Sequence, residues 1–100
     1  MKVFISQPMV DKTDEQIMQE REHAINVIKE RYQNVDDVEI IDSFIEHAPK
    51  DAKPLWYISK SIKFLCDADL AYFIGDWKKY RGCKAENYLA REYGIEVIEE

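Results

Sequence analysis

The stretch ADLAYFI, residues 68–74, is almost wholly apolar and ends at Gly75, a residue typical of turns. A short run rich in aliphatic and aromatic residues predicts a buried strand. A second run of this kind, KVFIS at residues 2–6, ends just before Pro8. Two buried strands favour a sheet that is covered by other elements on both faces.

Helical patterns lie between the predicted strands. The Thr13-Asp14-Glu15-Gln16 segment fits a capping box, and the apolar residues that follow recur at a helical spacing to about residue 32. Pro54 suits the first turn of a second helix, whose apolar stripe consists of Leu55, Ile58, Ile62 and Leu65. Residues 82–93 predict a third helix, with Gly94 as its C-terminal stop.

Two weaker strand signals complete the order of elements. VEIID at residues 38–42 and IEVI at residues 95–98 each lie next to a predicted helix, so the chain reads βαβαβαβ. This alternation predicts a three-layer α/β fold of the flavodoxin-like or Rossmann-like type, a parallel sheet of about four strands with helices on both faces. With 100 residues and 46% hydrophobic content, we expect residues 1–100 to form one domain with one core.

Composition excludes several classes of protein. A net charge of -6 and a pI of about 4.9 disfavour binding to a nucleic acid polymer or to an anionic membrane surface. The sequence has no apolar run that could span a bilayer and no secretory signal, so we expect a cytoplasmic protein. Cys66 and Cys83 lack the spacing of metal ligands, and we expect neither a disulfide, nor a metal, nor a cofactor.

In open parallel sheets, ligands bind beyond the carboxyl ends of the strands, where successive loops diverge. This rule predicts a site among residues 6–13, 42–53 and 75–86. Neither G-x-G-x-x-G after the first strand nor G-x-x-x-x-G-K-[ST] is present, so the usual dinucleotide and triphosphate loops are not predicted.

Three segments resemble the nucleoside 2-deoxyribosyltransferase-like superfamily, in its short bacterial and phage branch of unassigned domains: KVFISQP, ADLAYFIGDW and RGCKAENYLAREYGIEV. The resemblance covers nearly the whole chain. In that family an Ala-Asp pair lies on the third strand, a glycine precedes the nucleophilic glutamate by four residues, and an alanine and a glycine follow it by four and eight. The matching residues here are Ala68, Asp69, Gly82, Glu86, Ala90 and Gly94.

The resemblance implies cleavage or exchange of the N-glycosidic bond of a deoxynucleoside or its monophosphate. Glu86 would attack the anomeric carbon to form a covalent glycosyl-enzyme intermediate, and Asp69 would handle the proton of the leaving base. We expect the helix N-terminus to favour the ionised form of Glu86 while the neighbouring apolar strand limits water. The competing interpretation is that Glu86 is an ordinary first-turn carboxylate.

Two positions depart from the family pattern. Phe4 occupies the place of a tyrosine that donates a hydrogen bond to the nucleophile, and Tyr80 occupies the place of an aspartate that handles the base. Asp76 could replace that aspartate, and Tyr80 could supply the hydroxyl. These departures keep two alternatives open, a non-catalytic nucleotide-binding protein and an interaction module with a vestigial pocket. The predicted substrate-binding residues are Phe4, Ser6, Gln7, Pro8, Met9, Asp76, Trp77, Tyr80, Arg81 and Gly82.

Other side chains have two interpretations each. Trp77 and Tyr80 could stack on a base or pack on a second subunit. Lys78, Lys79 and Arg81 could hold a 5′-phosphate or be solvated surface charges. The resemblance also implies a homodimer or larger homo-oligomer, with Trp56, Tyr57 and Tyr88 as candidate contacts. His47 could act as an acid or a base, but the sequence names no partner for it.

Overall fold

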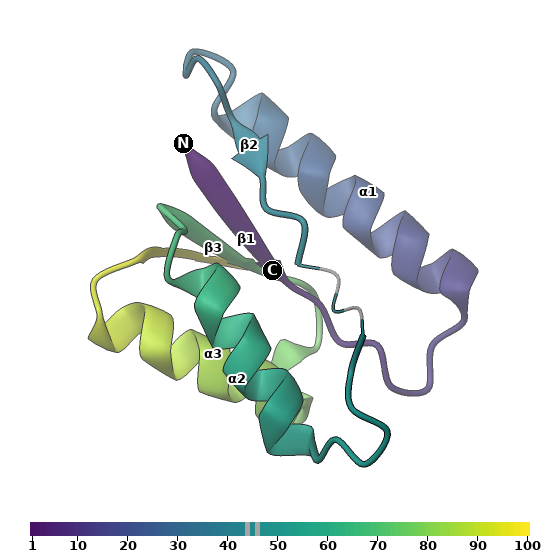
Figure 1. Ribbon diagram of the computed structural model, residues 1–100. Helices are drawn as coiled ribbons and strands as arrows, with labels where there is room; N and C mark the ends of the chain where they lie inside the picture. The colour runs from purple at the N-terminus through teal and green to yellow at the C-terminus, as the bar shows by residue number, and fades with distance from the viewer. Residues whose placement is uncertain (44, 46) are drawn as a thin grey trace.

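The computed structural model describes residues 1–43, 45 and 47–100. Along the chain, strands and helices alternate (Figure 1). The elements are β1 (Lys2–Ser6), α1 (Asp14–Arg31), β2 (Glu39–Ile40), α2 (Pro54–Leu65), β3 (Leu70–Phe73), the short 3-10 helix η1 (Trp77–Lys79), α3 (Arg81–Glu92) and β4 (Glu96–Glu99). None of the described helices combines the length and the apolar character needed to cross a membrane.

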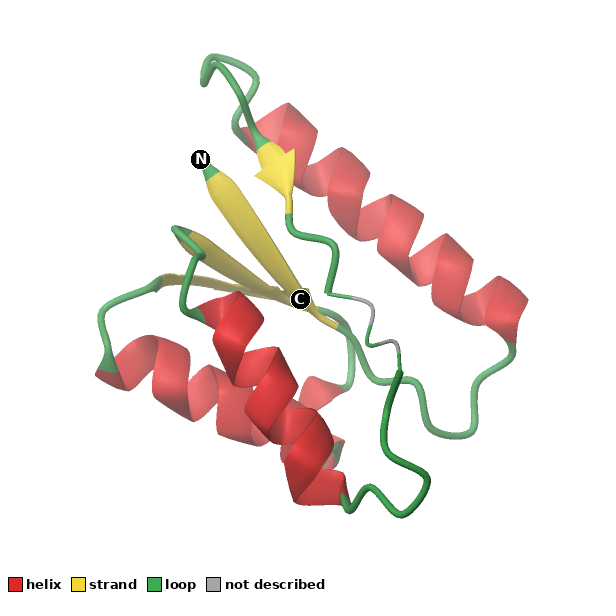
Figure 2. Cartoon of the chain, in the orientation of Figure 1, coloured by secondary structure: helices red, strands yellow, loops and turns green. Residues whose placement is uncertain are grey.

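The four strands form one parallel sheet in the order β2-β1-β3-β4. Helix α1 covers one face of this sheet, and α2 and α3 cover the other (Figures 1 and 2). This arrangement confirms the predicted three-layer α/β fold, and the strand order matches the first four positions of the flavodoxin-like type. Because the chain moves outward from β1 to β2 and then crosses to β3, the connections after β1 and β3 diverge between these two central strands.

The predicted bounds differ from the structure mainly at the edge strand. β2 has two residues in place of the predicted five, because it pairs on one side only and matches β1 at two positions. β3 begins at Leu70, so Ala68 and Asp69 precede the strand. η1 was not predicted, because three residues carry too little periodicity to reveal a helix.

The alternation of side chains along β1 divides the core into two layers. Val3 and Ile5 belong to the apolar cluster beneath α1, whereas Phe4 belongs to the cluster on the opposite face. The second cluster also contains residues of α2, β3, η1 and α3, namely Leu65, Ala71, Phe73, Trp77, Cys83 and Ala90. Ser6 has the same parity as Phe4 and therefore faces α2 and α3, a layer that is mostly apolar but also buries Glu86 and Asn87 of α3.

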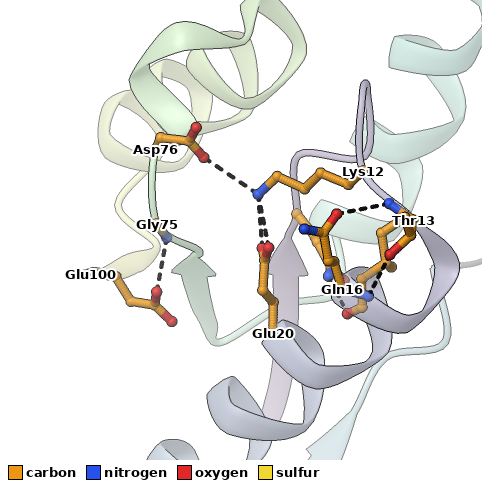
Figure 3. Close-up of polar contacts among 9 residues, drawn as sticks. Lys12, Thr13, Gln16, Glu20, Gly75, Asp76 and Glu100 are labelled. Carbon is orange, nitrogen blue, oxygen red and sulfur yellow. Dashed lines mark hydrogen bonds and ion pairs between the residues drawn. The ribbon is translucent and has the colours of Figure 1, made fainter.

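The start of α1 confirms the predicted capping box. The backbone N–H of Gln16 donates to Thr13 Oγ1 at 3.1 Å, and the backbone N–H of Thr13 donates to Gln16 Oε1 at 2.9 Å (Figure 3). Two N–H groups that the helix itself leaves unpaired are thereby satisfied.

We expect Thr13→Ala to lower the free energy of unfolding by about 1 kcal/mol, because it removes the acceptor for the Gln16 N–H. Urea-induced unfolding followed by circular dichroism measures this change. Thr13→Ser keeps the hydroxyl and is the matched control. Equal stability of the alanine and serine variants would contradict the role of the cap.

Candidate functional site

A buried hydrogen bond joins the end of β1 to α3. Ser6 is 1% exposed and Glu86 is 7% exposed. The Ser6 hydroxyl donates to Glu86 Oε1 at 2.8 Å, across 80 residues of sequence. Since Ser6 is the last residue of β1, this bond lies at the carboxyl end of the sheet, where the loops after β1 and β3 diverge. A carboxyl group is thus held in an apolar layer at the position where ligands of such folds bind.

The surroundings of Glu86 change its acidity. Burial raises the pKa of Glu86 from 4.5 to about 7, while hydrogen bonding to Ser6 and Ser61 acts in the opposite direction. Ser61 belongs to α2, so three elements determine the protonation of this one group. Near neutral pH both the carboxylate and the carboxylic acid are populated. The side chain can therefore act as a nucleophile or base in one form and as a hydrogen-bond donor in the other.

The start of α3 corrects one prediction about Glu86. The helix begins at Arg81, which makes Glu86 its sixth residue and places it beyond the first turn. The stabilising effect of a helix dipole fades within that first turn. The expected preference for the ionised form is therefore wrong, because burial dominates and raises the pKa.

The structure separates Asp69 from Glu86. Asp69 precedes β3, and its Oδ2 accepts a hydrogen bond from the backbone N–H of Lys2 at 2.8 Å. Lys2 begins β1 and Ser6 ends it, which corresponds to about 13 Å along the strand at the usual rise per residue. Asp69 thus lies at the amino end of the sheet, and the predicted pair of carboxyl groups is not formed.

The aromatic side chains near the site belong to the core. Trp77 is 7% exposed, and its ring centroid lies 5.4 Å from that of Phe73. Phe4 is buried in the same cluster, and Tyr80 packs against it from the position that precedes α3. Trp77 therefore supports the sheet face beside Glu86, and its buried ring leaves little surface on which a base could stack.

Residues of the loop after β1 have different surroundings. Gln7 Nε2 donates to the carbonyl oxygen of Ile17 at 2.6 Å, while Gln7 Oε1 is buried and has no partner among the described residues. Pro8 is buried, and Met9 is exposed. The predicted ligand-binding residues of this loop therefore have unlike environments. Gln7 is hydrogen-bonded to α1, whereas Met9 faces solvent.

The connection after β3 supplies charge and a close packing contact. Asp76 Oδ1 lies 3.5 Å from Lys12 Nζ. Arg81 is exposed, and Gly82 faces α2 so closely that a Cβ atom there would lie 3.1 Å from Ile58 Cδ1. Gly82 and Glu86 are four residues apart in α3 and so share one face of that helix.

Cys83 is a buried neighbour of the Ser6 and Glu86 pair. Burial raises the pKa of its thiol to about 11, and hydrogen bonding to Ser6 opposes this change. The thiol is therefore protonated at neutral pH, and only the thiolate is a strong nucleophile. Cys83 contributes to the packing of the site and gives it no second nucleophile.

The long connection between β2 and α2 carries a separate feature. An open depression of about 510 Å³ is lined by Pro49, Asp51, Ala52, Lys53, Leu55, Trp56 and Ser59. The hydrogen-bond partners of Glu86 described above, Ser6 and Ser61, do not line this depression. Phe44 and Glu46, which belong to the predicted site loop 42–53, lie outside the described residues. Within the described part of the chain, His, Cys, Asp and Glu form no cluster that could hold a metal ion.

Two residues of the site were missed by sequence reasoning. Ser61 lies within the apolar stripe of α2, three residues after Ile58 and one before Ile62. A lone hydroxyl on an otherwise apolar helix face was an available signal for a buried polar contact. Lys12 lies within the predicted site segment 6–13 but was not singled out, because its partners Glu20 and Asp76 come from different segments and are brought to it only by the fold.

Comparisons with protein-family models, curated proteins and solved structures found no match to this chain. The resemblance of its sequence to the deoxyribosyltransferase-like superfamily therefore stays a prediction. The observed site rests on the contacts of Ser6, Ser61 and Glu86 alone.

We expect Glu86 to make the protein less stable as the pH rises from 4.5 to 7. Over this range the unfolded chain releases the Glu86 proton while the folded protein keeps it, so the free energy of unfolding falls by roughly 3 kcal/mol from this group. Urea titrations at several pH values, compared with Glu86→Gln, isolate the effect. If the free energies of unfolding of the wild-type protein and Glu86→Gln differ by the same amount at every pH in this range, Glu86 does not have a raised pKa in the folded protein.

We expect Ser6→Ala to raise the pKa of Glu86 further, by about one unit or more, because a hydrogen bond to a charged group contributes about 1.5–3 kcal/mol. An NMR titration of the carboxyl carbon measures the pKa directly. Ser59→Ala is the matched control. The Ser59 hydroxyl donates to the carbonyl oxygen of Trp56 within α2 and not to Glu86, so its loss should leave the Glu86 pKa unchanged. A Glu86 pKa that is unchanged in Ser6→Ala would rule out Ser6 as the stabilising donor.

Proposed function

We propose that this protein binds a deoxynucleoside or deoxynucleoside monophosphate and cleaves or exchanges its N-glycosidic bond, with Glu86 as the nucleophile. The observation that carries this proposal is the buried hydrogen bond from Ser6 to Glu86 at the carboxyl end of the sheet. It supports the proposal because a desolvated, oriented carboxylate is what attack on an anomeric carbon requires. The resemblance of the sequence supplies the class of substrate.

Ser6 provides a replacement for the hydroxyl that Phe4 lacks. In the enzymes that this sequence resembles, a tyrosine on the first strand hydrogen-bonds the nucleophile, and here a serine two residues further along β1 donates instead. Phe4 and Ser6 have the same parity on the strand, so both face α3. The departure at Phe4 is therefore compatible with a positioned nucleophile.

The proposed reaction has two steps. An oxygen of the Glu86 carboxylate forms an ester bond to C1′ of the sugar, while the bond from C1′ to the base nitrogen breaks and its electrons leave with the base. Water or a second base then attacks C1′ and releases the Glu86 carboxylate. The hydrogen bond from Ser6 stabilises the carboxylate both before attack and as the leaving group of the second step.

Asp76 replaces Asp69 in this proposal as the carboxyl group that gives a proton to the departing base in the first step and takes one from the attacking water or second base in the second step. Asp76 follows β3 at the carboxyl end of the sheet, and its charge acts on the Cys83 thiol, which in turn adjoins Ser6. Asp69 has no comparable relation to the site, since it lies at the opposite end of β1 and β3.

A cluster of exposed cations favours a monophosphate over a nucleoside. Lys78, Lys79, Arg81 and Lys84 lie within seven residues around the start of α3, and no described ion pair involves them. Lys78 Nζ lies 5.7 Å from the centroid of the Trp77 ring. In a protein of net charge -6, such a local excess of cations favours an anionic group near the site.

A nucleotide-binding protein without catalysis is the second candidate. The raised pKa of Glu86 favours it, because a carboxyl group that is partly protonated at neutral pH can donate a hydrogen bond to a ligand without reacting. An interaction module with a vestigial pocket remains the third. Homo-oligomerisation stays a prediction for each candidate. Of its predicted contacts, Tyr57 and Tyr88 are exposed and Trp56 is half-buried, and Leu55 is a further exposed apolar residue of α2.

We expect release of free base from at least one deoxynucleoside or its 5′-monophosphate, measured by chromatography with and without a second base. Glu86→Gln should reduce the rate by about 10³-fold or more, because it removes the nucleophile while keeping an acceptor for Ser6. Glu92→Gln, an exposed substitution in the same helix, is the control and should retain full activity. Base release that survives Glu86→Gln would reject Glu86 as the nucleophile.

The pH dependence separates the two principal candidates. If Glu86 is the nucleophile, kcat/KM should rise as the pH increases through about 7, because the carboxylate is the reactive form. Absence of base release together with thermal stabilisation by one nucleotide would select the binding protein. If none of the compounds releases a base and none stabilises the protein, both candidates are rejected.

A further inference from the structure

Lys12 joins three segments at the carboxyl end of the sheet. It lies in the loop of residues 7–13 that follows β1, and its side chain is 16% exposed. Its Nζ lies 3.0 Å and 2.9 Å from the two carboxylate oxygens of Glu20 in α1, and 3.5 Å from Asp76 Oδ1 after β3 (Figure 3). The hydrogen bond with Glu20 raises the pKa of Lys12.

The two contacts of Lys12 differ in strength. Both Glu20 oxygens are at charge-assisted hydrogen-bond distance, whereas Asp76 is at the limit of that range. The contact with Glu20 spans 8 residues and anchors the loop to the helix that follows it. The contact with Asp76 spans 64 residues and is the one that ties the loop to the far side of the ligand-binding edge.

This bridge lies beside the Glu86 site. Residues 7–13 start directly after Ser6, which donates to Glu86, and Asp76 lies shortly before α3, which carries Glu86. The charges of Lys12 and Asp76 both act on the Cys83 thiol, which is a hydrogen-bonding neighbour of Ser6. A group that enters between the loops after β1 and β3 therefore meets the contact between Lys12 and Asp76.

Other features of the loop oppose its present position. Gln7 Oε1 is buried and has no partner among the described residues. Asp11 has a φ of 62°, a left-handed conformation that is uncommon outside glycine. Met9 and Val10 are 55% and 63% exposed at the loop tip. The start of the loop is held by buried Pro8 and by the hydrogen bond from Gln7 to Ile17. The following residues, 9–12, have no buried side chain, and Lys12 is the one among them that makes ion pairs among the described residues.

We propose that Lys12 is a positioning residue, a strap that holds residues 7–13 against Asp76 and controls access to the Glu86 site. In the strapped state Lys12 bridges Glu20 and Asp76. In the open state the longer contact with Asp76 parts while Glu20 keeps Lys12, and the loop moves with α1 as its base. The part of this inference that concerns ligands rests on the proposed function, and the part that concerns the loop does not.

Hydrogen exchange measured by mass spectrometry tests the strap without any ligand. We expect Lys12→Gln to accelerate amide exchange in residues 9–13 by about tenfold. The substitution removes the ion pair from the closed state, so the free energy of local opening falls. Lys12→Arg, which keeps the charge and the reach, should restore slow exchange. Lys29→Gln, an exposed substitution in α1, should leave it unchanged. Equal exchange of residues 9–13 in the wild-type protein and Lys12→Gln would overturn the proposal.

A double-mutant cycle identifies the partner that matters. Asp76→Asn should accelerate exchange of residues 9–13 as Lys12→Gln does, and the double variant should exchange no faster than either single variant. Additive effects of the two substitutions would show that the contact does not hold the loop. Exchange in β3 reports on global unfolding, which also loses the ion pair, so it should accelerate by no more than exchange in residues 9–13.

Binding kinetics test the control of access. For whichever of the four deoxynucleoside 5′-monophosphates binds, Lys12→Gln should raise the association and dissociation rates by a similar factor, with little change in Kd. Faster dissociation alone would mean that Lys12 contacts the ligand and does not control access. If none of the four binds the wild-type protein, the proposed function fails, and the exchange experiment still decides whether Lys12 holds the loop.

Discussion

Strands β1 and β3 pair over four residues, from Val3 opposite Leu70 to Ser6 opposite Phe73, and both are buried by helices on either side. Their burial is the constraint on which the rest of the protein depends. It requires one helical layer on each face, which α1 supplies on one side and α2 with α3 on the other. Because the two strands are central and parallel, their carboxyl ends meet at one edge, and the loops that follow them lie next to each other.

The same constraint makes the end of β1 chemically distinctive. A hydroxyl at Ser6 faces an apolar layer, where an unpaired polar group would be costly, and Glu86 provides its acceptor. Burying the ionised form of Glu86 is energetically unfavourable, and this desolvation raises its pKa to about 7. The buried pair therefore has two properties at once. It joins the sheet to α3, and it holds a carboxyl group that changes its charge near neutral pH.

Sequence reasoning predicted the fold because its signals were local. The apolar runs at residues 2–6 and 68–74, the Thr13 capping box and the stop at Gly94 each depend on neighbouring residues, and each has its counterpart in the structure. The length of β2 was wrong because pairing at a sheet edge is decided by the partner strand.

The site was predictable in part. Ser6 was predicted from its place in the loop after the first strand and Glu86 from the resemblance, but the hydrogen bond between them was not predicted. Asp69 was expected beside Glu86 because the family pattern links the two, and sequence spacing does not show that they occupy opposite ends of the sheet. Ser61 and Lys12 reach the site from separate segments, so only the assembled fold brings them there.

The close approach of Gly82 to Ile58 has a consequence for how this site can change over time. A Cβ atom at position 82 would lie 3.1 Å from Ile58 Cδ1, and one turn further along, Ser61 and Glu86 meet between the same two helices. The gap between α2 and α3 is therefore set by residues 58 and 82 together. A side chain at position 82 requires the end of Ile58 to shift by a few tenths of an ångström or position 58 to carry a smaller residue, so the two positions are expected to covary.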